Sequence, residues 1–145
     1  ANGCLVVFNQ IHHSPKRIEV LTSFYKHPIE IAAYSILIGF VVYSVFGGTA
    51  EAGAWYAFFA ATGEYFYHAN IRSPHWLGYF IQRPEHHSIH HQLDVHKYNF
   101  GDITLWDRLF GTFKDTHDFA KDCGFPRDNE QHFSDILKLK DVYQR

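Results

Sequence analysis

The chain of 145 residues contains no methionine and only two cysteines. Cys4 and Cys123 are too few and too far apart for a disulfide framework or a thiolate metal site. We therefore expect two unpaired thiols in a reducing compartment. Because a complete translated chain begins with methionine unless it is processed, we also expect further residues upstream of Ala1. The length predicts a single domain over residues 1–145.

A strong charge of one sign is likewise missing. The formal net charge is -2, and no basic stripe with interleaved aromatic residues is present. This composition excludes nucleic acid as the expected partner. The informative features are instead two apolar runs and an unusual set of histidines.

The two apolar runs predict a helical hairpin in a membrane. Residues 31–46 carry no charge and, extended to Gly48, approach the ~20 residues that a bilayer crossing needs. A glycine-rich turn follows, and a second apolar run over residues 54–63 leads to His68. Aromatic residues near the turn are typical of a membrane interface. We predict a transmembrane hairpin over about residues 29–68; the alternative is a buried hairpin in a soluble protein.

The histidines concentrate in one stretch, residues 84–91 (Pro-Glu-His-His-Ser-Ile-His-His). If this stretch is helical, three imidazoles spaced i, i+3 and i+4 share one face. An upstream stretch repeats the spacing with asparagine in its first place. Neutral imidazole is a common metal ligand, so both stretches predict metal binding. The residues are His87, His90 and His91 downstream, and Asn9, His12 and His13 upstream.

The hairpin also predicts how these stretches meet. It returns the chain to the side it left, so His68 and both histidine stretches are expected at one membrane face. Basic residues ahead of the first run, Lys16, Arg17 and Lys26, favour the cytoplasmic side. Six histidines with few carboxylates favour iron or another borderline divalent metal. Six nitrogens exceed a four-coordinate zinc site, so we expect two metal ions.

The predicted fold class is therefore all-α: a membrane helical hairpin with a cytosolic histidine-rich helical cap. The cap is expected over about residues 69–113 and includes a helix over residues 103–111 that stops at Gly111. A charged, soluble tail over residues 114–145 follows, with a last helix over residues 135–140.

The other histidines and three further polar residues are expected to support the ligands, to make local contacts or to lie at the surface. His86 lies beside the ligand face, so we expect it behind the ligands or at the surface. Asn99 and Asp107 are expected either to hydrogen-bond ligand histidines or to form a turn and a helix cap. Arg108 is expected to pair with a neighbouring carboxylate. The isolated histidines are expected at the surface: His27, His75, His96, His117 and His132.

Five segments resemble the fatty acid hydroxylase/sterol desaturase superfamily of integral membrane non-haem di-iron enzymes. They are residues 9–14, 66–70, 87–91, 99–101 and 106–112, and the last of them (Trp-Asp-Arg-Leu-Phe-Gly-Thr) is a strong marker. The resemblance implies one fatty acid hydroxylase-like domain that hydroxylates or desaturates a lipid, such as a sterol or fatty acid, with O2. It also implies two Fe ions (or Zn, as isolated) and an external electron donor of cytochrome or ferredoxin type.

Carried over by position, the resemblance implies a set of metal ligands and a location. The location is the bacterial inner membrane or the endoplasmic reticulum, with the histidine boxes on the cytoplasmic side. The implied metal ligands are His12, His13, His68, His87, His90 and His91.

The chain departs from the family pattern at three points. Asn9 stands where the second histidine box usually begins with histidine, and Glu64 stands where some members have a further histidine. We expect Glu64 as a carboxylate ligand or as a partner of His68, and Asn9 as a weaker oxygen ligand. The third departure is that the earlier histidine box of the family is missing from these residues, and we expect it upstream of Ala1. The alternatives are a catalytically incomplete metal-binding or scaffold protein of the same family, and a soluble histidine-rich metal protein.

Overall fold

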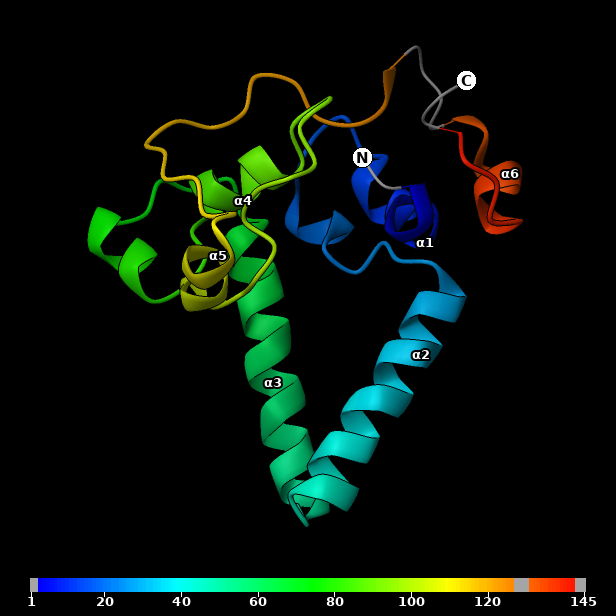
Figure 1. Cartoon of the computed structure of the whole chain (residues 1–145), viewed down its shortest axis with the longest axis vertical. Coiled ribbons are helices and arrows are strands. Elements are labelled where there is room, and N and C mark those ends of the chain that lie inside the picture. The colour runs from blue at the N-terminus through cyan, green and yellow to red at the C-terminus, as the bar shows by residue number, and fades with distance from the viewer. Residues whose placement is uncertain (1–2, 127–130, 143–145) are drawn as a thin grey trace.

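The computed structural model describes residues 3–126 and 131–142, with side chains from residue 7 onward. Within these ranges the chain is helical and contains no named strand; two isolated bridges, Ile81–Ile103 and Gln92–Cys123, join loops. Two long helices diverge from a common turn, and the shorter elements form a cap over their open ends (Figure 1). The elements are α1 (Gly3–His13), η1 (Val20–Thr22), α2 (Pro28–Gly39), η2 (Phe40–Val45), α3 (Ala50–Tyr67), η3 (His75–Tyr79), α4 (Pro84–His90), α5 (Thr104–Phe110) and α6 (Phe133–Leu137).

Local capping sets the ends of the two long helices. The α2 helix begins with Pro28, and the His27 ring accepts a hydrogen bond from the Ile29 N–H at 3.1 Å. It continues as a π-helical turn, η2. The Thr49 hydroxyl caps α3 by accepting from the Ala52 N–H at 3.2 Å. Gly47, at φ 64°, takes the left-handed conformation in the turn between the two helices.

Among the residues that the structure describes, one helical segment is long and apolar enough to cross a membrane. Residues Pro28–Val45 have a mean hydropathy of 1.7, and none of this segment is buried inside the protein. Large apolar side chains such as Ile36 and Phe40 are therefore exposed along its length. The α3 helix also has 18 residues, but its mean hydropathy is lower because it contains the charged residues Glu51 and Glu64.

The loop and helix that contain the strong family marker are held together by Asp107. Its carboxylate accepts hydrogen bonds from the Phe100 N–H (2.9 Å), the Gly101 N–H (2.8 Å) and the Thr112 hydroxyl (2.5 Å). The α5 helix then ends at Gly111, whose φ of 70° is left-handed. The predicted stop at Gly111 is confirmed, and Asp107 stabilises the turn.

The C-terminal segment packs back onto α1. Ile136 and Val142 are buried with Ile11 and Phe125 in a small core. The Gln10 amide donates to the Lys140 carbonyl at 3.0 Å and accepts from the Val142 N–H at 2.8 Å. The predicted last helix is present as α6, shifted to Phe133–Leu137. This tail therefore fixes the helix that carries the upstream histidine stretch.

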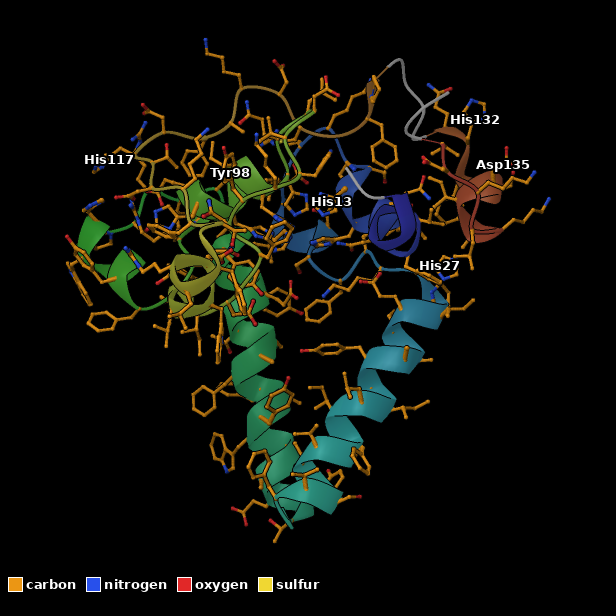
Figure 2. The ribbon with its side chains drawn as sticks, viewed as in Figure 1. His13, His27, Tyr98, His117, His132 and Asp135 are labelled. Atoms are coloured by element: carbon orange, nitrogen blue, oxygen red, sulfur yellow. The ribbon has the colours of Figure 1, made fainter. Side chains whose placement is uncertain are left out.

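Two sequence expectations about single residues are wrong. His27 is buried rather than on the surface, because its ring caps α2 and contacts the Leu137 carbonyl oxygen at 3.2 Å. Arg108 donates to the Gly78 carbonyl at 3.1 Å and lies 3.9 Å from the Phe113 ring centroid. Its guanidinium therefore stacks on an aromatic ring and does not form an ion pair in the described part of the chain. His117 and His132 are exposed, at opposite edges of the cap (Figure 2), and the side chain of Cys4 lies outside the described residues.

Candidate metal centre

The α4 helix is short, and almost all of it is buried, which is unusual for a segment so rich in polar residues. It starts at Pro84 directly after Arg83, and the Arg83 guanidinium lies 2.9 Å from the Glu85 carboxylate. Glu85 also accepts hydrogen bonds from the N–H and the hydroxyl of Ser73, both at 2.9 Å. This buried, fully paired ion pair holds the first turn of α4 in place and points the following histidines inward.

Four histidines from three helical elements converge at the base of the cap. His12 lies at the end of α1, His68 caps the end of α3, and His87 and His91 are one turn apart on α4. One nitrogen of each lies within 4.8 Å of the others, and all four residues are buried. Segments that are distant in sequence thus bring four imidazoles to a single point.

Hydrogen bonds on the outer side of two rings determine which nitrogen carries the proton. The His68 Nδ1 lies 2.8 Å from the Glu64 backbone oxygen, and the His87 Nδ1 lies 2.8 Å from the Gln82 side-chain oxygen. Both oxygens are acceptors, so each Nδ1 is protonated and each Nε2 has a lone pair. These two Nε2 atoms are only 3.1 Å apart, and the His91 Nε2 is 2.9 Å from that of His87.

Such an arrangement is repulsive unless a cation lies between the lone pairs. Burial lowers the pKa of His12 from 6.5 to about 2, and the neighbouring His68 adds to the lowering. Burial also lowers the pKa of His87 and of His91 well below 6.5. The rings are therefore neutral at physiological pH, which is the form of imidazole that binds metal. The donor set suits a borderline divalent metal such as iron or zinc.

The remaining implied ligands form a second group beside the first. The ring centroids of His13 and His90 are 4.8 Å apart, and the His13 ring stacks on that of His91 at 4.3 Å. The His90 Nδ1 lies 2.9 Å from the Tyr98 backbone oxygen, so its Nε2 has a lone pair, as in His68 and His87. The Nδ1 atoms of His12 and His13 are buried without a hydrogen-bond partner among the described residues. All six implied histidines thus belong to one cluster.

A family model for fatty acid hydroxylases matches residues 2–112. The chain belongs to the fatty acid hydroxylase family. This confirms the family resemblance of the histidine motifs. The family is known for di-iron, histidine-box enzymes, and the convergent lone pairs fit such metal ions.

Two kinds of curated relative extend the match. The chain is 27% identical over 117 residues to a very-long-chain aldehyde decarbonylase of Oryza sativa, found in both subspecies indica and japonica; this covers 73% of the chain and 44% of the relative. It is 26% identical over 137 residues to sphinganine C4-monooxygenase 1 of Arabidopsis thaliana, which covers 89% of the chain and 53% of the relative. The chain spans about half the length of the curated relatives it matches. A comparison with solved structures found no significant match.

The other polar residues that the sequence suggested as ligands or as partners of ligands contribute no nitrogen or oxygen to the four-histidine group. His86 is buried, and its Nε2 lies 2.9 Å from the Asp115 carboxylate, on the other side of α4. The Asn99 amide donates to the backbone oxygens of His86 and Lys114, both at 3.0 Å. Of the two alternatives that we expected for Asn99 and Asp107, the structure shows turn formation: Asn99 binds backbone groups, and Asp107 binds two backbone N–H groups and the Thr112 hydroxyl.

Asn9 and Glu64, the two departures from the family pattern, also have defined places. The Glu64 carboxylate accepts a hydrogen bond from the Lys26 ammonium at 2.7 Å, while its backbone oxygen orients His68. The Asn9 side-chain oxygen is buried without a hydrogen-bond partner in the described part of the chain.

Sequence reasoning missed Gln82, which fixes the tautomer of His87. Its side-chain NH2 donates to the Asn99 backbone oxygen, so the amide oxygen must face the His87 Nδ1. The Gln82 N–H donates to the Asp102 carbonyl at 2.8 Å, beside the Ile81–Ile103 bridge. Only one signal pointed to it: a polar residue shortly before a histidine box.

We predict that Gln82→Ala weakens metal binding by about 10- to 100-fold, because the His87 ring loses the acceptor that orients it. Metal affinity of the full-length protein, measured by competition with a chelator, checks this. The control is Gln131→Ala, which changes an exposed glutamine far from the cluster. Equal affinities for the two variants would contradict the role of Gln82.

We further predict that the chelated, metal-free protein becomes less stable as the pH falls from 6.5 toward 5. Burial lowers the pKa of His12, His87 and His91 in the folded state, so below pH 6.5 the unfolded state binds more protons and gains stability. Each such histidine lowers the free energy of unfolding by about 1.4 kcal/mol per pH unit. The thermal unfolding midpoint, followed across this pH range, measures the slope.

The control is His132→Ala, because that histidine is exposed and should leave the slope unchanged. His12→Leu should make the slope shallower by about one proton. An unfolding midpoint that is constant from pH 7 to pH 5 would refute the buried, neutral state of these rings.

Proposed function

We propose that this chain is the histidine-rich part of a membrane-bound, O2-dependent oxidoreductase that hydroxylates or desaturates a lipid. The observation that carries the proposal is the convergence of four buried histidines, in which the lone pairs of His68 and His87 point at each other, close to a largely apolar cavity. The relatives named for a monooxygenase and for an aldehyde decarbonylase support an oxidative reaction on a long-chain substrate.

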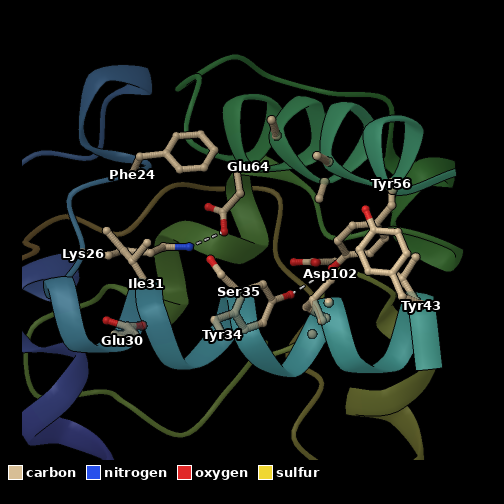
Figure 3. A pocket seen from close by; sticks show the side chains of 18 of the residues that line it. Phe24, Lys26, Glu30, Ile31, Tyr34, Ser35, Tyr43, Tyr56, Glu64 and Asp102 are labelled. Carbon is tan, nitrogen blue, oxygen red and sulfur yellow. Dashed lines mark hydrogen bonds and ion pairs between the residues drawn. The ribbon is translucent and has the colours of Figure 1, made fainter. Parts of the chain in front are cut away.

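The cavity between α2 and α3 is the proposed site of the acyl chain or sterol body. It has a volume of about 670 Å³, and its walls are largely apolar, with Ile31 and Ile38 from α2, Val42 from η2 and alanines from α3. The ion pair of Lys26 and Glu64 lies at the end nearest the cap (Figure 3). The Glu30 carboxylate lines the same end, and one of its oxygens is buried without a hydrogen-bond partner in the described chain. This polar end favours a lipid that carries a hydroxyl or amine donor.

Residues at the polar end of the cavity contact the histidine cluster. Glu64 lines the cavity and also contributes the backbone oxygen that orients His68. Asp102 lines it as well and accepts a hydrogen bond from the Tyr67 hydroxyl at 2.8 Å. The Tyr67 ring centroid is 4.6 Å from that of His87. A lipid in the cavity would therefore lie one side chain away from the ligand histidines.

In this proposal the protein holds the metal ions, orients the rings that bind them and excludes water. Two iron ions, held by the six histidines of the cluster, would supply activation of O2 and oxidation of a C–H bond, with electrons from an external donor of cytochrome or ferredoxin type. The outer hydrogen bonds of His68, His87 and His90 fix their rings for this task. The burial of the cluster keeps bulk water from the reacting atoms.

The membrane position rests on the exposed apolar surface of the hairpin. Ile36 is 73% exposed and Phe40 is 59% exposed, although both lie in a segment with the hydropathy of a membrane span. In water, such a surface would be an aggregation hazard; in a bilayer, it is the lipid-facing surface. We place the hairpin of residues 29–68 in the membrane and the cap at its cytoplasmic face.

A second candidate function, a metal-binding scaffold without catalysis, is favoured by Asn9. This residue stands in the place of a box histidine, and its side-chain oxygen is buried without a hydrogen-bond partner in the described chain. A cluster with one ligand fewer could bind metal and yet fail to turn over. Measurement of O2 consumption separates the two functions.

We predict that the full-length, iron-loaded protein consumes O2 in the presence of a reductant and a long-chain hydroxylated lipid, and that His87→Ala abolishes this consumption. The Nε2 atoms of His68 and His91 both lie within 3.1 Å of the His87 Nε2, so loss of His87 removes the centre of the cluster. The measurement is O2 uptake together with mass spectrometry of the lipid. His117→Ala, at an exposed histidine, should retain activity. Iron binding without O2 uptake in the unmodified protein would favour the scaffold.

We also predict that Ala60→Phe lowers lipid turnover at least tenfold while the iron content stays unchanged, because the added ring projects into the cavity and obstructs the lipid. The matched control is Ala54→Phe on the same helix, since Ala54 is exposed and does not line the cavity. Turnover and iron per chain are measured on both variants. If the two variants turned over lipid at the same rate, the acyl chain would have to bind elsewhere.

A further inference from the structure

His96 lies against the second group of histidines, although the sequence places it outside every histidine box. Its ring is perpendicular to that of His13, with centroids 5.3 Å apart. His13 is in turn 4.8 Å from His90. Three imidazoles from α1, α4 and the loop after α4 are therefore neighbours beside the four-histidine group, with the His13 ring next to both of the others.

The loop after α4 is built to bring His96 back to the cluster. Asp94 takes a left-handed conformation at φ 61°, and the Val95 N–H donates to the Gln92 carbonyl at 3.0 Å. The Leu93 N–H donates to the Asp122 carbonyl at 3.0 Å, and Gln92 forms a bridge with Cys123. These bonds reverse the chain within five residues of His91 and anchor the turn to the C-terminal segment. A non-glycine residue keeps the left-handed conformation only where surrounding contacts hold it there, so these bonds fix the geometry of the turn.

The orientation of the His96 ring follows the same rule as that of the other histidines. The ring hydrogen-bonds to the His90 backbone, an interaction that favours its protonated nitrogen as donor. The His90 Nδ1 in turn lies 2.9 Å from the Tyr98 backbone oxygen. In both rings the protonated nitrogen is turned outward to a carbonyl, which leaves the other nitrogen with a lone pair.

We propose that His96 is a ligand of a metal ion held with His13 and His90, next to the ion held by the four-histidine group. The ligand chemistry is that of a borderline divalent metal, such as iron, zinc or cobalt. The inference rests on the metal centre of the proposed function and adds a ligand that the family motifs do not assign. His96 would also compensate for Asn9: it supplies an imidazole to a centre whose upstream box has one histidine fewer than the family pattern.

The test uses the full-length protein in detergent, loaded with Co2+ as the probe. In His96→Cys, a thiolate bound to Co2+ gives a sulfur-to-metal charge-transfer band in the near ultraviolet, which imidazole ligands do not give. We expect this band in His96→Cys and not in His117→Cys, whose side chain is exposed. The unmodified protein, which contains Cys4 and Cys123, provides the baseline.

Metal stoichiometry provides the second readout. We expect His96→Ala to lower the affinity for one of two metal ions at least tenfold and to leave the other unchanged, while His117→Ala binds both as the unmodified protein does. A His96→Cys spectrum identical to the baseline, together with unchanged affinities in His96→Ala, would overturn the assignment. If His96→Ala binds as predicted but O2 uptake is absent, the ligand stands and the proposed function fails. If the unmodified protein binds no metal at all, both fail.

Discussion

The structure depends on one electrostatic constraint: neutral imidazoles whose lone pairs point at one another inside a buried cluster. The Nε2 atoms of His68 and His87 approach to 3.1 Å, and each is fixed as an acceptor by an oxygen on the far side of its ring. Burial keeps the rings of the cap from taking up protons that would relieve the repulsion, since it lowers the pKa of His87 far below 6.5. A bound cation removes the repulsion and turns each ring into a ligand. The fold therefore places its least favourable contacts where metal binding recovers the free energy.

The surrounding elements make sense as supports for that cluster. The paired Arg83 and Glu85 hold the start of α4, and the tail covers the α1 helix through Gln10. The backbone oxygen of Glu64, at the last turn of α3, is both a helix-end carbonyl and the acceptor for His68. Because carbonyls in the last turn of a helix lack partners within the helix, a ligand placed at the cap position gains its orienting bond from the helix itself. The junction of hairpin and cap is thus also the edge of the candidate metal centre.

The sequence predicted the parts of this arrangement that follow from spacing. The all-helical class, the stop at Gly111 and the family were predictable, because they depend on periodicity, a left-handed cap and local motifs. Contacts between distant segments were not. His27 was expected at the surface, yet it caps α2 and meets Leu137, a residue 110 positions later. Gln82 carries no motif, and its role exists only because the amide is turned by a neighbouring carbonyl. Asn99 was ambiguous in sequence, and only the structure shows that it binds backbone groups.

The histidines outside the motifs show that a histidine that is isolated in the sequence need not be exposed in the structure. His96 and His117 look alike as single residues in polar loops, but His117 lies exposed at the edge of the cap (Figure 2), whereas His96 faces His13. The difference arises from one left-handed residue, Asp94, which reverses the loop after α4. A turn of this kind costs backbone strain of about 1 kcal/mol or more, so it persists only where other contacts repay it. Here those contacts come from the C-terminal segment on one side and the histidine cluster on the other, and this ties the geometry of the centre to residues that no histidine motif includes.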